Sequence, residues 1–104
     1  MPKTNVIELP GAPSSLSAEA RRLWQSLSDE YVIDDAAGLA ILGELCQTVD
    51  RLREIQKAIH AAGLMVDGYN GQPRPNPLLK SEAEARRLVL SHYRALALNP
   101  EDFA

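Results

Sequence analysis

The side chains that could act as acids, bases, nucleophiles or metal ligands do not form a catalytic pattern. Asp34 and Asp35 are adjacent, so they point in different directions and are better suited to capping a helix than to acid–base catalysis. His60 and His92 have no cysteine, histidine or acid at ligand spacing. Cys46 lies within an apolar helical pattern, as a small buried hydrophobic residue does. We therefore predict that the protein is not an enzyme and that it has no catalytic residue, metal site or cofactor.

Basic residues are better candidates for a functional surface, because Lys and Arg bind the phosphates of nucleic acids. They form groups on three segments: Arg21 and Arg22; Arg51, Arg53 and Lys57; and Arg86, Arg87 and Arg94. Acidic residues accompany each group, so ordinary solvated faces with pairs inside each helix explain the groups equally well. The formal net charge of −3 is unlike that of a free-standing nucleic-acid-binding domain.

The element that must position many of these residues is a proline-free segment, residues 35–62, which Gly63 ends. At about 1.5 Å of rise per residue, a helix of this length extends for roughly 40 Å. Leu45, Leu52 and Ile59 lie seven residues apart and predict a central apolar seam. The opposite side is polar and holds Glu44, Gln47, Asp50, Arg51, Glu54 and Lys57. Such a helix requires other helices of the chain, neighbouring subunits, or both, to cover its apolar side.

Two further amphipathic helices flank the long one. Ser17 is a suitable N-cap for the first, which we expect to end at about Tyr31. Asn76-Pro77 is a typical helix start, and the last helix is predicted to run from Pro77 to about Leu98. Its polar stripe consists of Lys80, Glu84, Arg87, Ser91 and Arg94.

The segment between the long helix and the last helix predicts a small β-hairpin at about residues 64–75. Leu64–Val66 can form one strand and Gln72–Pro75 the other. Asn70-Gly71 is a strong turn signal that predicts a tight type I′ turn, since both residues tolerate positive φ. The two prolines of the second limb restrict it to the edge of a sheet.

These patterns predict a mainly α fold: a short helix, a long central helix, a small β-hairpin and a C-terminal helix. Residues 1–15 hold three prolines and no helical period, so we expect an extended N-terminal arm before a single helical domain over residues 16–104. A core of this size is marginal alone and favours a homo-oligomer. No apolar run approaches the roughly 18 residues of a membrane span. The N-terminus lacks the apolar region of a secretion signal.

In their order and spacing, these motifs resemble the small terminase subunits of tailed double-stranded DNA phages. The resemblance rests on LSAEARRLW in the first helix, AAGLMV at the end of the long helix and PNPLLKSEAEARRLVLSHYRALALNP over the last. It spans about residues 13–100. The sequence departs from the family pattern at Ala97, where glycine is usual, and at Glu101 and Asp102, where an arginine usually follows the proline. It also has only Lys3 as a basic residue in the arm.

The resemblance implies a non-catalytic, ring-forming subunit in the cytoplasm of the bacterial host. Its partners would be double-stranded viral DNA, the terminase large subunit and further copies of the chain, with no membrane. Family members bind viral DNA and hand it to the large subunit, which holds the ATPase and nuclease. The residues expected to bind DNA are Arg21 and Arg22, followed by Arg51, Arg53 and Lys57.

The same resemblance makes the hairpin a subunit contact or a partner surface. It also makes Trp24 and Leu27 the anchor of the first helix on the long one. The alternative is a helical adaptor that binds the large subunit or another partner without contacting DNA.

Overall fold

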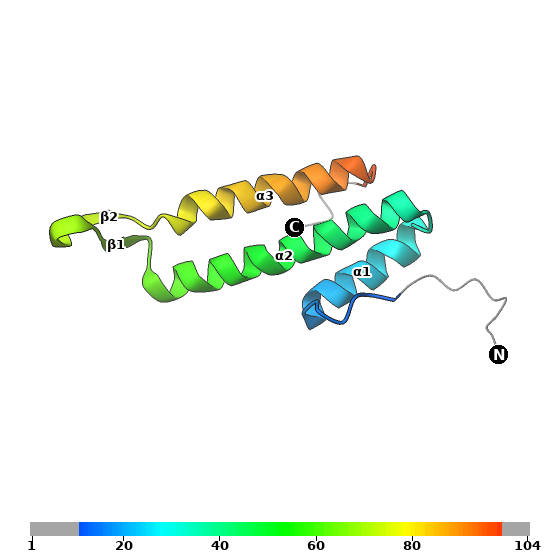
Figure 1. Cartoon of the computed structure of the whole chain (residues 1–104), viewed down its shortest axis with the longest axis horizontal. Helices are drawn as coiled ribbons and strands as arrows, with labels where there is room; N and C mark the ends of the chain where they lie inside the picture. Colours follow the sequence, from blue (N-terminus) through cyan, green and yellow to red (C-terminus); the bar gives the residue numbers. More distant parts are fainter. Residues whose placement is uncertain (1–10, 99–104) are drawn as a thin grey trace.

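The computed structural model describes residues 11–98, which form three helices and a two-stranded antiparallel hairpin (Figure 1). The elements in chain order are α1 (Ala18–Tyr31), α2 (Ala36–Ala62), β1 (Met65–Asp67), a short 3-10 turn (Tyr69–Gly71), β2 (Pro73–Pro75) and α3 (Leu78–Ala95). The predicted mainly α fold is confirmed in the same order. Residues 1–10 of the expected arm, with Lys3, and residues 99–104, with Glu101 and Asp102, lie outside the described part.

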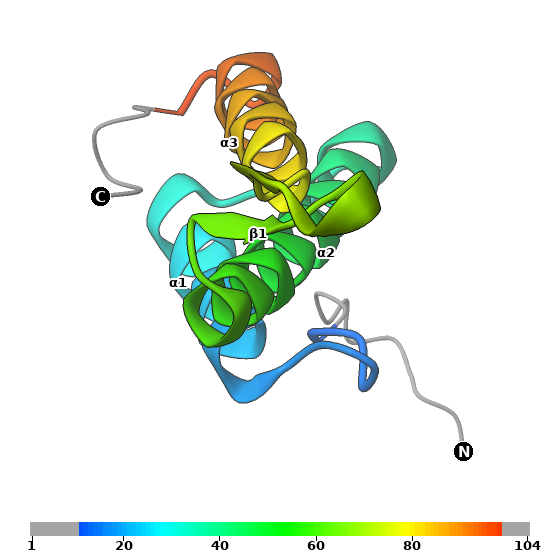
Figure 2. The ribbon, with the colours of Figure 1, turned by 90° about the vertical axis from the view of Figure 1, so that its left-hand side faces the viewer.

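The long helix α2 is the centre of the molecule. α3 lies antiparallel along it, while α1 packs against the half of α2 that is nearer its N-terminus, as Figure 1 shows. Seen from the end, α1 and α3 occupy different sides of α2 (Figure 2). The hairpin continues the long axis of the molecule beyond the helices. Within residues 11–98, none of the helices combines the length and apolar character that a bilayer crossing requires.

Local capping residues fix where α1 and α2 begin and end. Ser17 Oγ accepts the Ala20 N–H at 3.1 Å, and the Asp35 carboxylate accepts the Gly38 N–H at 3.0 Å. Both side chains thus satisfy amide donors that the first helical turn leaves free. α2 ends at Gly63, whose φ of 92° lies in the region that glycine adopts without strain.

The hydrophobic core forms where the predicted seam of α2 meets the other helices. Leu45 and Leu52 are completely buried, and Ile59 is 8% exposed. Val89 and Tyr93 of α3, together with Trp24 and Leu27 of α1, belong to the same buried set. The periodicity therefore gave the correct rotation of α2, except at Asp50, which was expected on the wet side and is half-buried because it binds the N-cap of α1.

The hairpin differs in detail from the predicted two-residue turn. Met65 pairs with Pro75, and Asp67 with Pro73, so residues 68–72 connect the strands. Asn70 and Gly71 both have positive φ, at 65° and 76°, as a type I′ turn requires. The Gly71 N–H, however, bonds to the Gly68 carbonyl at 3.0 Å, which places the closing hydrogen bond one residue earlier.

Asn76 links the end of α2 to the start of α3. Its side-chain oxygen accepts the Leu78 N–H at 2.9 Å, and its amide nitrogen donates to the Gly63 carbonyl at 2.9 Å. At the other end, α3 stops at Ala95, three residues before the predicted end. Ala97 adopts a left-handed φ of 60° and thereby turns the chain out of the helix.

Candidate nucleic-acid interface

Two side-chain contacts hold α1 on α2 and so position the predicted DNA-binding residues. The Ser17 N–H donates to Asp50 Oδ2 at 2.8 Å, and the Ser17 hydroxyl also donates to the Asp50 carboxylate. Close by, Arg53 Nε, three residues after Asp50, pairs with Glu19 Oε2, two residues after Ser17, at 3.0 Å. The start of α1 is therefore fixed beside the middle of α2.

Arg21 and Arg22 are both exposed on α1. Arg22 faces a shallow groove between the three helices, which Arg53 of α2 and Tyr93 of α3 also line. Arg21 does not line this groove. The structure thus brings Arg22 and Arg53 together and leaves Arg21 on the open surface next to them.

The three basic residues predicted on α2 lie in a second groove, between the start of α1 and the middle of α2. This groove is lined by Arg51, Arg53 and Lys57 and also by Glu19, Asp50 and Glu54. The Arg53 guanidinium is occupied by Glu19 and by Gln56 Oε1, the latter at 2.9 Å. Because basic and acidic groups are balanced there, the groove has little electrostatic preference for a polyanion.

A third groove runs between α2 and α3 and has a different character. Ile55, Leu78, Ala85 and Leu88 provide its apolar surface, and Glu44, Glu54 and Glu84 provide acidic groups. Arg51 lines this groove as well as the groove between α1 and α2, so it lies at the boundary between the two grooves. An apolar groove with acidic residues suits a protein partner better than DNA.

The groups with potential chemical reactivity do not converge. Cys46 is completely buried, and this burial, with a smaller contribution from the Asp50 charge, raises the pKa of its thiol from 9.0 to about 12. The thiol therefore stays protonated and unreactive at neutral pH. His60 is exposed and His92 half-buried. Across residues 11–98, no three His, Cys, Asp or Glu side chains gather as metal ligands would.

One set of exposed basic residues was not among those predicted to bind DNA. Lys80, Arg87 and Arg94 are all exposed along α3. The sequence places them seven residues apart, which is a spacing that keeps side chains on one helix face. The sequence analysis grouped Arg87 and Arg94 with Arg86 as candidate basic residues and placed all three members of this set in the polar stripe of the helix, but it predicted none of them to bind DNA.

Comparison with known proteins identifies one family. The family model described as "Phage terminase, small subunit" matches residues 17–103 of this chain. No match was found among curated proteins or among solved structures. The match covers all three helices and the hairpin.

Proposed function

This chain belongs to the phage terminase small-subunit family, and on that basis we propose that it is the non-catalytic DNA-recognition and assembly component of a viral DNA-packaging motor. In this role it binds double-stranded viral DNA and presents it to the terminase large subunit, which supplies the ATPase and nuclease. It acts in the cytoplasm of the bacterial host. The observation that carries the proposal is the family match over nearly the whole chain.

The DNA-binding residues that we propose are Arg21 and Arg22, supported by Arg51, Arg53 and Lys57. Arg21 and Arg22 are exposed and adjacent, and Arg51 and Lys57 are exposed on the neighbouring part of α2. Arg53 contributes less as a free charge, because Glu19 holds it. Since the net charge of the chain is −3, a single copy should bind DNA weakly.

Assembly into a homo-oligomeric ring would overcome this weakness. Each copy presents the same arginines, and contacts made by linked copies act at a high effective concentration. The seam of α2 is largely covered within one copy, so the surfaces available for assembly lie elsewhere. The hairpin exposes Tyr69 by 89% and Leu64 by 65%, and exposed apolar side chains of this kind favour a subunit contact.

Titration of a labelled duplex at low and moderate salt tests the DNA role. We expect wild-type protein to bind weakly and with strong salt dependence, and Arg21→Glu/Arg22→Glu to lose much of this binding. Arg74→Glu/Arg86→Glu is the matched control, because it makes the same change in charge at two other exposed arginines. Equal binding by Arg21→Glu/Arg22→Glu and wild type would move the site to Arg51, Arg53 and Lys57.

A native mass measurement, with and without the duplex, tests assembly. The ring proposal requires several copies per particle at micromolar concentration, and a clean monomer would contradict it. Should wild-type protein bind no duplex at low salt but still co-purify with the large subunit, the protein-only adaptor becomes the function.

A further inference from the structure

The positive charge of this acidic protein is concentrated on α3. This helix carries four basic and two acidic side chains, whereas α1 carries two basic and three acidic and α2 carries three of each. The hairpin strands add one of each sign, Asp67 and Arg74. Among the described helices, α3 is therefore the one with a net positive charge.

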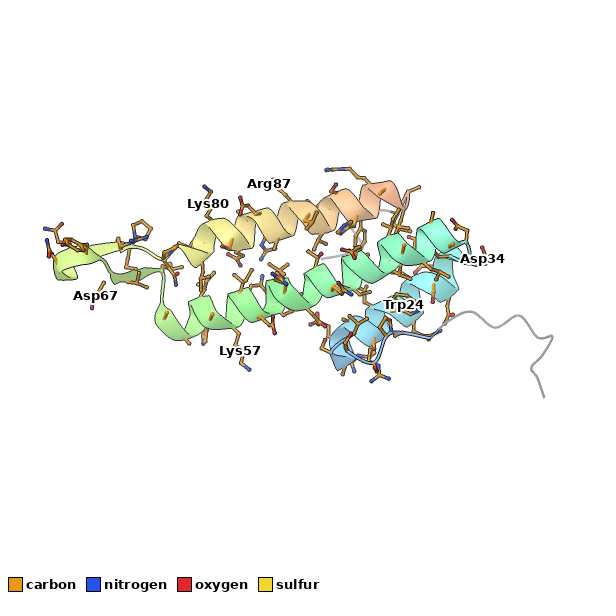
Figure 3. All side chains as sticks on the ribbon, in the orientation of Figure 1. Trp24, Asp34, Lys57, Asp67, Lys80 and Arg87 are labelled. Atoms are coloured by element: carbon orange, nitrogen blue, oxygen red, sulfur yellow. The ribbon has the colours of Figure 1, made fainter. Side chains whose placement is uncertain are left out.

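Three of the four basic residues of α3 form one straight row, which we call the α3 basic row: Lys80, Arg87 and Arg94. A spacing of seven residues turns an α-helix by two full turns less about 20°, so the three side chains stay on one face. Each step advances about 10.5 Å, and the row spans about 21 Å. Figure 3 shows that Lys80 and Arg87 both point away from α2, into open solvent.

The row is positively charged overall, although Glu84 stands in the same polar stripe, four residues after Lys80 and three before Arg87. In the described part of the chain, the ion pairs are Arg53–Glu19 and Arg86–Glu82, and no member of the row takes part in one. The fourth basic residue of the helix, Arg86, differs in this respect, because Glu82 lies 3.6 Å from it. The three basic side chains of the row are therefore held in no ion pair, and with the single acid Glu84 their stripe has a net charge of +2.

The stability of α3 does not account for the whole row. Arg94 lies in the last turn, where the helix dipole favours a cation. Lys80 is the third residue of the helix, where the same dipole disfavours one. A positive charge at Lys80 therefore does not stabilise the helix. Its position does extend the row by a third basic side chain.

We propose that the α3 basic row is a second contact surface for duplex DNA, which binds the phosphate backbone independently of base sequence. The choice of ligand rests on the proposed function, and the surface itself is inferred from the charges of α3. At about 3.4 Å of duplex axis per base pair, the row spans about six steps of a duplex lying along the helix. Lys57 points from α2 in the opposite direction in Figure 3, so this surface is separate from the α2 residues assigned above.

The test compares neighbouring arginines on the same helix. Arg87→Gln and Arg86→Gln remove the same charge from two adjacent exposed residues, of which only Arg87 belongs to the row. We expect Arg87→Gln to weaken duplex binding by about threefold or more. The negative slope of log affinity against log salt should become shallower by about 0.9. Arg86→Gln should leave affinity within about twofold of wild type, because its charge is already paired.

The triple variant Lys80→Gln/Arg87→Gln/Arg94→Gln extends the comparison. Its negative slope of log affinity against log salt should be shallower than that of wild type by about 2.7, three times the contribution of one phosphate contact. A native mass measurement on each variant ensures that oligomers of equal size are compared. If the triple variant fails to fold, the comparison of Arg87→Gln with Arg86→Gln decides the proposal alone.

Three results would overturn the inference. Equal affinity and slope for wild type and the triple variant would do so while leaving the proposed function intact, provided that Arg21→Glu/Arg22→Glu still reduces binding. Equal losses in Arg87→Gln and Arg86→Gln would show an effect of net charge rather than of the row. The absence of duplex binding by wild-type protein at low salt would remove the row and the proposed DNA role together.

Discussion

Asp50 holds Ser17 through two hydrogen bonds, although the two residues are 33 positions apart in the sequence. Its carboxylate accepts both the backbone N–H and the hydroxyl of Ser17. The same hydroxyl oxygen accepts the Ala20 N–H as the N-cap of α1. The start of one helix is thus fixed to the middle of another by a single acidic side chain.

Replacing Asp50 should therefore loosen α1. Because hydrogen bonds to a charged group contribute about 1.5 to 3 kcal/mol, we expect Asp50→Ala to lower the free energy of unfolding by about this amount. Denaturant unfolding monitored by circular dichroism measures the change. Glu54→Ala is the control, since Glu54 is exposed and should change stability by less than about 0.5 kcal/mol. Equal stabilities for both variants would show that the contact contributes nothing.

Replacing Ala97 by glycine should stabilise the protein. The Leu98 N–H bonds to the Tyr93 carbonyl and the Ala97 N–H to the Arg94 carbonyl, which is the Schellman pattern of helix ends. Ala97 holds a φ of 60° in this pattern, and its Cβ makes that conformation unfavourable. We expect Ala97→Gly to raise the free energy of unfolding by about 1 kcal/mol. The control Ala95→Gly, within the helix, should lower the free energy of unfolding by about 1 kcal/mol. Thermal unfolding measures both variants, and a fall in melting temperature for Ala97→Gly as well as for Ala95→Gly would contradict this account.

The stability of the protein should decrease in alkali because of Cys46. Burial raises the pKa of its thiol from 9.0 to about 12 in the folded state, so above pH 9 the unfolded chain ionises first and is favoured. This group alone lowers stability by at most about 1.4 kcal/mol for each pH unit over that range. Cys46→Ala, which lacks the thiol, should lose less stability between pH 9 and pH 11. Parallel pH profiles for the two proteins would show that the thiol does not titrate differently on unfolding.

Leu52 should be among the most sensitive core positions. It is completely buried at the centre of the α2 seam, and a change of leucine to alanine at such a site lowers stability by about 2 to 5 kcal/mol. Leu88→Ala is the matched control, because Leu88 is 48% exposed and its truncation should have a much smaller effect. Thermal unfolding of both variants makes the comparison, and a midpoint for Leu52→Ala equal to that of wild type would contradict the packing described.

The helices were predictable because their signals are local. Ser17 and Asp35 cap through side chains that accept amide groups three residues away, and the Asn76 side chain accepts the N–H of Leu78, the first residue of α3. Gly63 ends α2 through its own backbone angle. The seven-residue spacing of Leu45, Leu52 and Ile59 likewise predicted the buried side of α2. Such patterns depend on the helix itself and not on how the helices are arranged.

The features that escaped prediction depend on distant partners. Asp50 lies on the polar side of its own helix, and its half-burial follows only from the approach of Ser17. Arg53 was expected to be available to DNA, but Glu19, 34 residues away, pairs with it. Likewise, the early end of α3 depends on Ala97 adopting a conformation that is unusual for alanine.

The hairpin has two edges with unequal capacity to accept another strand. The Gly68 N–H donates to the Gln72 carbonyl, and the Asn76 N–H donates to the Leu64 carbonyl. The backbone N–H and C=O groups of the even-numbered residues in the second limb therefore point toward β1, and the backbone of Pro73 and Pro75 faces the outer edge. Proline has no N–H to offer, and the outer edge of β2 cannot form a regular ladder. Growth of this sheet can therefore proceed only through β1. Two such hairpins joined edge to edge would present β2 on both sides and stop at four strands, which protects the chain from edge-to-edge growth into fibres.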